Sequence, residues 1–311
     1  MFIRLKQIAY KVVRPLIQSE IDKLNHRLAP ERILENRYVT AKRFMPLEGR
    51  EGFYVTLKQD KPAISVSSRD LPVPPRELWE GYGRTPEEYL ALGQEHVDKM
   101  VSILGAAGKA PATFRRVLDF GCAAGRMLRF LPEYMVHAEL WGIDAKAETI
   151  SWCQQYLNPP CLFAANTTYP SLPFEDNYFD LIYAGSVFTH IADLADAWFL
   201  ELRRVLRRGG CAYVTILDKN AIKHLFDDFE TGKYPELQWF VEMLRRFNNK
   251  TNVLSKDYGC FSVEGGSWGG FPVPQVSYDI NYLVQKWSPF AKVVSINERA
   301  YGFQTAILFE K

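Results

Sequence analysis

The residues of this chain that could do chemistry begin with an acidic residue and two glycines. They lie in the segment Val117-Leu-Asp-Phe-Gly-Cys-Ala-Ala-Gly-Arg126, where an apolar run that predicts a strand leads into the pattern Asp119-x-Gly121-x-x-x-Gly125. Glycine adopts backbone angles and allows close approaches that a Cβ would block. Helical spacing over residues 127–131 predicts a helix next, whose N-terminus would present free N–H groups and a positive dipole end. Such a strand, loop and helix can bind a nucleotide-like ligand against bare backbone.

A second acidic residue, Asp144, ends the next predicted strand, residues 139–144. It lies about 20 residues beyond the glycine loop, the spacing at which a carboxylate can accept two hydrogen bonds from a ribose diol. Nicotinamide enzymes share this feature, so Asp144 indicates a nucleoside-containing ligand but does not distinguish one such ligand from another. The alternative for Asp144 is an ordinary exposed residue before the helix that residues 147–156 predict.

The glycine loop differs from two common nucleotide-binding loops. A dinucleotide-binding loop would read G-x-G-x-x-G and a P-loop would require Gly-Lys-Ser/Thr, and this loop has neither the middle glycine nor the lysine. Its D-x-G-x-x-x-G pattern closely resembles motif I of the class I S-adenosylmethionine (SAM)-dependent methyltransferases. On this segment alone, a tight turn in some other α/β protein is the alternative. Residues 172–191, which read as turn, strand and active-site loop, resemble the type-11 branch of the same family and favour the methyltransferase.

The resemblance implies a fold, a cofactor and a set of binding residues. The fold is α/β and Rossmann-like, with a doubly wound, seven-stranded and mostly parallel sheet, and the cofactor is SAM. Asp119 would orient the methionine part of SAM, Asp144 would bind the ribose hydroxyls, and Ala145 would flank the adenine. Asn166, where many members have Asp, would accept a hydrogen bond from the adenine amino group. The expected cofactor-binding residues are Asp119, Phe120, Gly121, Cys122, Gly125, Arg126, Asp144, Ala145, Asn166, Thr167, Ala184, Gly185 and Ser186.

His190 is the candidate catalytic residue. Histidine titrates near neutrality, so His190 can act as a general base, and Asp193 three residues later could orient it. Methyltransferases with unrelated acceptors carry a similar histidine at this place, so the alternative role is support of the cofactor loop. The sulfonium methyl of SAM is already activated, and the enzyme mainly aligns an acceptor and removes its proton.

Several elements must position these residues. Residues 195–206 predict a helix that ends at Arg207-Arg-Gly-Gly210, because basic residues followed by glycine suit a helix C-terminus. Thr85, Pro86 and Glu88 predict the start of another helix before motif I. The remaining expected elements are strands at residues 161–165, 179–183 and 211–217, helices at 235–247 and 279–287, and a final hairpin at 290–296 and 304–309.

Two segments are expected to wall the acceptor pocket. Residues 51–96 carry Tyr82 and Tyr89, which are candidate substrate contacts. Residues 219–277 read as an insertion after the fifth strand of the core, and insertions at the carboxyl edge of such a sheet lie over the ligand crevice. Tyr258 and Trp268 of the insertion could stack on a sugar or another ring, or could form the small core of the insertion itself.

The start of the chain is basic. Residues 2–17 place apolar side chains at helical spacing with basic ones between them, which predicts an amphipathic helix. Through residues 1–50 the chain could contact a membrane surface or form a homo-dimer, and packing on its own protein is the alternative. The expected domains are an N-terminal extension at 1–75, a SAM-binding core at 76–218, a substrate-capping insertion at 219–277, and a helix and β-hairpin at 278–311 that complete the core.

The composition restricts the class of protein. The 311 residues carry a net charge of +2, too balanced to indicate a nucleic-acid partner. The five cysteines form no C-x-x-C pair, so neither a metal site nor a disulfide framework is predicted, which fits a reducing compartment. No apolar run reaches the ~18 residues of a transmembrane helix. We expect a cytoplasmic protein, or one peripheral at the inner face of a membrane.

The favoured function is SAM-dependent O-methylation of a small-molecule acceptor or of a sugar or glycan hydroxyl. The Asn/Asp-Pro-Pro-Tyr/Phe motif used on exocyclic amines is absent after the fourth strand, where Ala184-Gly-Ser-Val stands, and this disfavours nucleobase N-methylation. The alternatives are a non-catalytic SAM-binding subunit and an N-methyltransferase of small amines. A short-chain nicotinamide oxidoreductase would need a Tyr-x-x-x-Lys pair, and none lies in a suitable place after the fifth strand.

Overall fold

The computed structural model describes residues 39–47, 50–57, 71–158, 160–268 and 271–311. The chain divides into two compact units, Met1–Asp60 and Lys61–Lys311. In the first unit, β1 (Val39–Leu47) and β2 (Arg50–Leu57) form an antiparallel hairpin. The amphipathic helix predicted for residues 2–17 lies outside the described residues.

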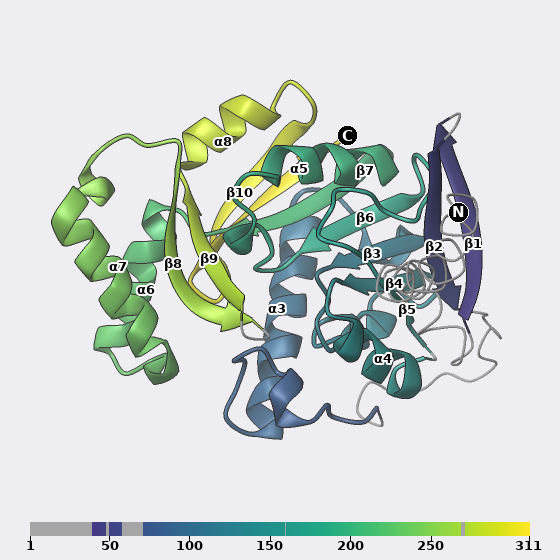
Figure 1. The fold of residues 1–311 in the computed structure, drawn as a ribbon, viewed down its shortest axis with the longest axis horizontal. Helices are drawn as coiled ribbons and strands as arrows, with labels where there is room; N and C mark the ends of the chain where they lie inside the picture. The colour runs from purple at the N-terminus through teal and green to yellow at the C-terminus, as the bar shows by residue number, and fades with distance from the viewer. Residues whose placement is uncertain (1–38, 48–49, 58–70, 159, 269–270) are drawn as a thin grey trace, which may run out of the picture. The chain divides into compact units, whose positions relative to one another are not determined.

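The second unit is built on a seven-stranded sheet in the order β10-β11-β7-β6-β3-β4-β5 (Figure 1). The neighbouring pairs from β7 to β5 are parallel, and β11 and β10 add an antiparallel edge. This confirms the predicted doubly wound, mostly parallel α/β architecture. The strands are β3 (Arg116–Phe120), β4 (Glu139–Asp144), β5 (Leu162–Ala165), β6 (Phe179–Ala184), β7 (Leu206–Ile216), β10 (Lys292–Tyr301) and β11 (Gln304–Glu310).

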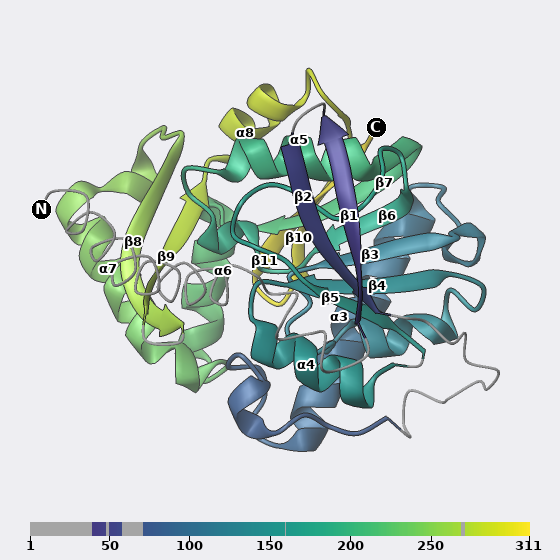
Figure 2. The same ribbon diagram turned by 45° about the vertical axis from the view of Figure 1, so that its right-hand side comes forward.

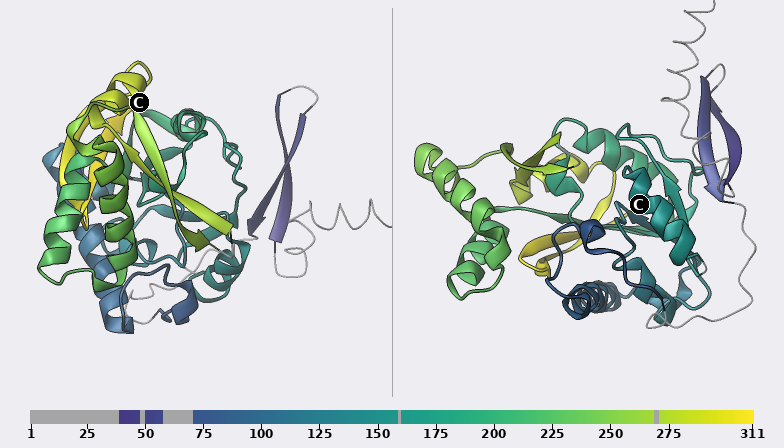
Figure 3. Two further views of the ribbon diagram at one scale, coloured as in Figure 1. Left: turned by 60° about the vertical axis from the view of Figure 1, so that its left-hand side comes forward. Right: turned by 60° about the horizontal axis from the view of Figure 1, so that its bottom comes forward.

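Helices cover both faces of this sheet (Figure 3). On one face, α3 (Pro86–Ala106) and α4 (Ala147–Tyr156) bury residues such as Met100 and Ile150 against the strands. On the other face, α5 (Ala195–Val205) and α8 (Ile280–Trp287) contribute a second apolar core, in which the rings of Phe199 and Trp287 stack at 4.1 Å. Each predicted helix of the core therefore has an apolar stripe that meets the sheet. Among the described helices, none combines the length and apolar character needed to cross a membrane.

The predicted start of α3 is confirmed, with one difference. The Thr85 hydroxyl accepts a hydrogen bond from the Glu88 N–H, and Pro86 occupies the first turn, where a missing N–H costs little. In a capping box, the Glu88 carboxylate would also accept a hydrogen bond from the Thr85 N–H, but it does not do so here. It accepts instead from the Arg84 N–H at 2.8 Å and from the Arg84 guanidinium.

The α-helix predicted directly after the glycine loop is wrong. The chain there forms a short 3-10 helix, η4 (Leu128–Glu133), that contains Pro132. Proline lacks an N–H and clashes with the preceding turn, so a longer α-helix cannot propagate through it. The α-helix N-terminus expected directly after this loop is therefore not formed, and residues 128–133 present the start of a 3-10 helix instead.

A second prediction is also wrong, at the end of α5. The helix ends at Val205, and Arg207-Arg-Gly-Gly210 belongs to the extended β7 rather than to a helix C-terminus. Asp180 on β6 pairs with Arg207, and the Gly209 N–H donates to the Lys311 carbonyl at 2.7 Å. Strand pairing outweighs the local helix-ending signal here.

Residues 219–277 hold more regular structure than the sequence indicated. They form α6 (Lys219–Glu230), which was not predicted, α7 (Gln238–Thr251), near the predicted 235–247, and a hairpin of β8 (Cys260–Trp268) and β9 (Phe271–Tyr278). α6, α7 and β8 share a small apolar core, whereas Val276 and Tyr278 of β9 pack in the core of the sheet. The four elements gather on one side of the sheet (Figures 1 and 2). Ser277 of β9 forms an isolated parallel bridge with Leu217, which directly follows β7, so the hairpin is joined to the end of that strand.

Asp218 gives the first testable prediction, because it joins this segment to the sheet. Its buried Oδ1 accepts from the Ala221 N–H at 2.9 Å and from the Thr305 hydroxyl at 2.8 Å. The substitution Asp218→Ala should lower the free energy of unfolding by about 1–3 kcal/mol, measured by urea denaturation. The matched control is Asp279→Ala, which removes the cap of α8 but no such strand contact. A loss no larger than that of the control would contradict this account.

Candidate cofactor site and active-site loop

Three strand tips meet at the carboxyl edge of the sheet. Because β3, β4 and β5 are neighbours, Gly121, Asp144 and Asn166 come together although they lie far apart in sequence. The N–H groups of Gly121 and Cys122 donate to the Ile143 carbonyl at 2.8 and 3.0 Å, and the Asn166 N–H donates to the Asp144 carbonyl at 3.0 Å. The three positions expected to bind methionine, ribose and adenine therefore adjoin.

The glycine loop has the backbone that its sequence suggested. Gly121 and Gly125 have φ values of +78° and +69°, in the left-handed region that glycine tolerates best. A Cβ on Gly121 would lie 2.4 Å from Cγ2 of Val187, and one on Gly125 would lie 2.6 Å from Cδ1 of Leu157. The glycines are needed for close packing of the protein on itself as well as for an open backbone.

Asp144 supports the loop while leaving acceptor capacity. Its Oδ2 accepts from the Ala123 N–H at 2.9 Å, and its Oδ1 accepts from the Lys146 N–H at 2.8 Å. Burial raises the pKa of Asp144, and the two N–H groups oppose that rise. Since each carboxylate oxygen has two lone pairs, one remains on each for the hydroxyls of a ribose.

Asn166 has a buried oxygen with no partner. Its Oδ1 is among the few buried side-chain atoms without a hydrogen bond in the described part of the chain. A buried polar atom of this kind costs about 1–3 kcal/mol unless a donor reaches it. The amino group of adenine is such a donor, so Asn166 fits the cofactor expected here. The neighbouring Thr167 hydroxyl is bonded within its own turn, where it accepts from the Tyr169 N–H at 3.2 Å.

Asp119 is buried beneath the loop. Burial raises the pKa of its carboxyl to about 8, and the nearby Asp144 acts in the same direction, while Tyr183 and Arg126 oppose the shift. The protein groups around Asp119 thus favour its neutral form at neutral pH. A cationic group placed beside it would favour the carboxylate.

A cavity beside the loop is lined by Asp119, Gly121 and Gly185 on the sheet side and by aromatic rings on the other. Tyr82 and Tyr89, which the sequence singled out, belong to this wall, and Tyr89 stacks on Trp79 with ring centroids 5.1 Å apart. Trp79 and Tyr301 also line the cavity, and sequence reasoning missed both.

Arg126 points into this aromatic wall. Its guanidinium lies 3.8 Å from the centroid of the Tyr82 ring, donates to the Tyr301 hydroxyl and approaches Nδ1 of His96 at 3.1 Å. The side chain is buried, and no carboxylate forms an ion pair with it among the described residues. A buried guanidinium beside the cavity can receive the carboxylate of an amino acid.

Another buried arginine fixes the aromatic segment. Arg129 donates to the carbonyls of Leu71 and Pro72. The Trp79 indole N–H donates to the Pro74 carbonyl at 2.7 Å. The chain from Leu71 to Trp79 is therefore held next to motif I, which brings its rings to the cavity.

The active-site loop after β6 rests on an inward hydrogen-bond network. Ser186 has a φ of +60°, its N–H donates to the Thr215 hydroxyl at 2.7 Å, and its own hydroxyl accepts from the Gln304 amide at 2.8 Å. The side chain of Ser186 thus supports the loop, whereas Gly185 lines the cavity. A Cβ on Gly185 would lie 2.7 Å from the Tyr301 ring.

His190 lies at the end of this loop and is exposed. Its Nδ1 is 3.2 Å from the Pro274 carbonyl on β9 and 3.4 Å from the Gln275 amide nitrogen. The carbonyl is the nearer of the two and can only accept, so we assign the proton to Nδ1, which leaves Nε2 as a free base. Surrounding protein atoms lower the pKa of His190, and the negative charge of Glu80 opposes that effect. No hydrogen bond joins the side chains of Asp193 and His190, so Asp193 does not orient the imidazole as predicted. The Pro274 carbonyl orients it instead.

The two candidate rings of the insertion differ in outcome. Tyr258 donates or accepts a hydrogen bond with the Ser277 hydroxyl at 3.0 Å and meets the Phe261 ring edge-on at 5.0 Å. It belongs to the small core of the insertion, the second of the two roles considered. The side chain of Trp268 lies outside the described residues.

Comparison with known proteins agrees with this geometry. Residues 118–214 match the family described as "Methyltransferase domain". An uncharacterized methyltransferase of Schizosaccharomyces pombe is 30% identical over 105 residues, which are 30% of this chain and 37% of that protein. Sterol 24-C-methyltransferase of the same yeast is 34% identical over 137 residues, 41% of this chain and 33% of that protein. The matches thus span little more than a third of these relatives.

A solved SAM-dependent methyltransferase from Clostridium acetobutylicum aligns with a TM-score of 0.47 and 11% identity over 70% of this chain and 91% of its own. The motifs, the sheet order and the family match show that residues 118–214 are a class I SAM-dependent methyltransferase domain of the type-11-like branch. SAM is the cofactor of that class.

Asn166 provides a prediction about adenine. The substitution Asn166→Ala should weaken SAM binding about tenfold, because the adenine amino group loses its acceptor. The stability of the ligand-free protein should not fall, since the Asn166 oxygen has no partner there. Calorimetric titration and thermal denaturation measure the two effects. Thr167→Ala is the control, and equal losses of affinity in both variants would contradict the assignment.

Asp119 provides a prediction about pH. Since the protein groups raise the pKa of Asp119 to about 8, Asp119 must lose its proton when a cationic methionine group binds. SAM affinity should therefore rise with pH up to about 8 and level off above it. In Asp119→Asn, any change of SAM affinity with pH comes from groups other than Asp119, such as those of the cofactor. The ratio of the SAM affinity of the unsubstituted protein to that of the variant therefore reports the titration of Asp119. This ratio should change roughly tenfold or more between pH 6 and pH 8. A constant ratio would show that Asp119 does not lose a proton when SAM binds.

Proposed function

We propose that this chain transfers the methyl group of SAM to a hydroxyl of a small molecule, sugar or glycan. The observation that carries the choice of a hydroxyl is the free Nε2 of His190, whose other nitrogen is engaged by the Pro274 carbonyl. A neutral imidazole with an available lone pair suits the removal of a hydroxyl proton during attack. A neutral amine needs no such base, so N-methylation is the weaker candidate.

Binding would rest on three groups of the cofactor site. Asp144 takes the ribose hydroxyls, the Asn166 oxygen takes the adenine amino group, and the Arg126 guanidinium takes the methionine carboxylate. The bound cofactor supplies a methyl group already activated by the positive sulfur. The rings of Trp79, Tyr82 and Tyr89 exclude water around that methyl.

The acceptor would approach between the active-site loop and the β8–β9 hairpin. His190 and its backbone partner Pro274 come from these two elements, so the base lies where they meet. The Nε2 atom of His190 receives the hydroxyl proton as the new carbon–oxygen bond forms and the carbon–sulfur bond breaks. The products are the methyl ether, S-adenosylhomocysteine and a protonated His190.

The names of the relatives do not agree on an acceptor. One is a sterol 24-C-methyltransferase, and two others are phthiotriol/phenolphthiotriol dimycocerosates methyltransferases of Mycobacterium ulcerans. A carbon acceptor is therefore a real competitor to a hydroxyl. We also propose that residues 1–50 contact a membrane or a second copy of the chain. The protein would be cytoplasmic and would bind no nucleic acid.

The substitution of His190 tests the hydroxyl acceptor. Once a panel of hydroxyl, amine and carbon acceptors has yielded one with turnover from labelled SAM, His190→Ala should lower kcat about 10²–10⁴-fold with unchanged SAM affinity. Gln275→Ala, next to the same imidazole, is the control.

Two outcomes would count against this proposal. Equal losses of turnover and SAM affinity in His190→Ala would make the histidine structural. SAM binding with no turnover on any acceptor class would favour the non-catalytic subunit instead.

A further inference from the structure

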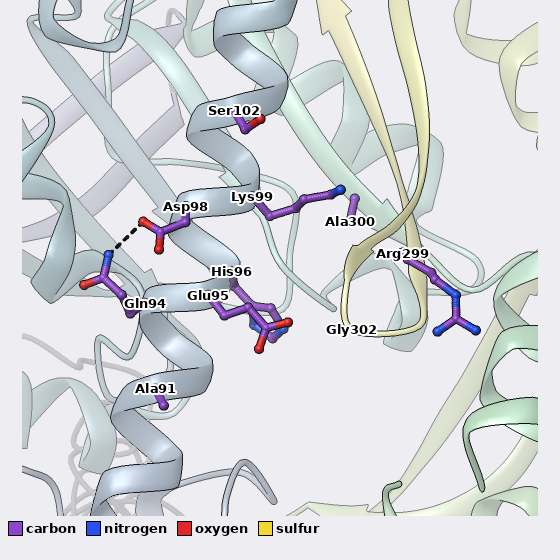
Figure 4. Close-up of a pocket in the computed structure, with 10 residues that line it drawn as sticks. All are labelled: Ala91, Gln94, Glu95, His96, Asp98, Lys99, Ser102, Arg299, Ala300 and Gly302. Atoms are coloured by element: carbon purple, nitrogen blue, oxygen red, sulfur yellow. Dashed lines mark hydrogen bonds between the residues drawn. The ribbon is translucent and has the colours of Figure 1, made fainter. Parts of the chain in front are cut away.

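A groove separate from the cofactor cavity lies between α3 and the turn that joins β10 to β11 (Figure 4). Its α3 wall carries Glu95, Asp98 and Lys99, and its other wall includes Ala300 and Gly302. His96 also lines the groove, although its side chain is only 4% exposed. This histidine is not used by the function proposed above.

Arg126 determines which nitrogen of His96 carries the proton. Nη1 of Arg126 lies 3.1 Å from Nδ1 of His96, and a guanidinium can only donate, so Nδ1 accepts. Burial holds the pKa of His96 well below its usual value, and the positive charges of Arg126 and Lys233 act in the same direction. The ring is therefore neutral, and its proton lies on Nε2.

The Nε2–H group of His96 faces the groove without an acceptor. The ring is fixed by stacking on Tyr301, with centroids 3.9 Å apart, and Nε2 is 4.0 Å from where a Cβ on Gly302 would lie. No acceptor for this N–H exists among the described residues. Nε2 is not among the fully buried unpaired atoms, so it is accessible from the groove and can donate to an incoming acceptor.

The acidic groups of the groove are already matched. Asp98 accepts hydrogen bonds from Gln94 and Tyr134, and Glu95 lies close enough to Lys233 for their charges to attract. Neither carboxylate therefore needs a cation from outside. Both would repel a ligand with a large negative charge.

One cation of the groove has no such match. Arg299 is bound to Asp228 at 2.7 and 2.9 Å, and its guanidinium points away from α3 (Figure 4). Lys99, in contrast, has no ion-pair partner within the described part of the chain, and its ammonium extends toward Ala300 (Figure 4). The groove thus offers one unpaired ammonium and one unpaired N–H donor.

We propose that this groove binds the carboxylate of a small molecule between the His96 Nε2–H and the Lys99 ammonium. The two side chains are three residues apart on α3, so they lie on one helix face about 5–6 Å apart at Cβ. A planar carboxylate can give one oxygen to each donor. The two further carboxylates of the groove repel a ligand with a single negative charge less than one with two, so they disfavour a phosphate more than a carboxylate.

The site is linked to the cofactor cavity through Arg126. An acceptor on Nε2–H makes the opposite nitrogen of the imidazole more basic, which strengthens its bond from Arg126. Arg126 in turn contacts the Tyr82 ring in the cavity wall. The groove ligand and SAM therefore affect each other's affinity reciprocally. This link rests on the proposed function, whereas carboxylate binding does not.

The test uses protein labelled with ¹⁵N-histidine and sodium acetate as the probe, with sodium chloride at equal ionic strength as the reference. His96 signals, assigned by their loss in His96→Asn, should show a proton on Nε2 and none on Nδ1. Acetate should shift the Nε2–H signal saturably, at roughly millimolar concentration for so small a ligand. Lys99→Met should weaken this binding at least fivefold, and Lys250→Met, at an exposed lysine on α7, should not.

Four outcomes would overturn the proposal. They are a proton on Nδ1 of His96, no saturable shift with acetate, equal losses in the two lysine variants, or tighter binding of inorganic phosphate than of acetate. None of these measurements uses SAM, so a failure here is distinct from a failure of the methyltransferase proposal. A change in SAM affinity on adding acetate, lost in Lys99→Met, tests the link through Arg126.

Discussion

The cofactor site depends on three consecutive backbone N–H groups that bond to the tip of the neighbouring strand. Those of Gly121 and Cys122 share the Ile143 carbonyl, and that of Ala123 reaches the Asp144 carboxylate. The side chain expected to bind ribose therefore also holds the loop expected to bind methionine. Because these bonds run between β3 and β4, the spacing between the two parts of the ligand is fixed by the distance between strands.

A pair of arginines extends this arrangement away from the sheet. Arg126 and Arg129 are three residues apart, just after the glycine loop, yet they serve opposite ends of one segment. Arg129 holds the carbonyls of Leu71 and Pro72, and Arg126 contacts the ring of Tyr82 further along. The aromatic wall of the cavity is thus held in place by residues that directly follow the glycine loop at its floor. Buried guanidinium groups suit this role because they can satisfy several acceptors at once.

Much of the fold and part of the site could be predicted from the sequence. Asp144 and Asn166 follow recognisable strands, and parallel strands bring their ends to one edge, so their proximity follows from topology. The helix expected after motif I is only a short 3-10 helix, because Pro132, just beyond the residues with helical spacing, prevents a longer α-helix. Trp79 and Tyr301 could not be found, because nothing local marks them. Trp79 reaches the cavity because Arg129 binds the carbonyls of Leu71 and Pro72, and Tyr301 reaches it through the last hairpin. Both depend on contacts that are distant in sequence.

The contact between Gly185 and Tyr301 has a consequence for synthesis of the protein. The active-site loop passes so close to the Tyr301 ring that a Cβ at residue 185 would lie 2.7 Å from it, and Gln304 bonds the next residue, Ser186. Both partners come from β10 and β11, more than a hundred residues later. On the ribosome, motif I and its strands emerge first, but the pocket stays incomplete until those final strands are translated and docked. The wall of the pocket that Tyr301 supplies is therefore among the last parts of this unit to form during synthesis.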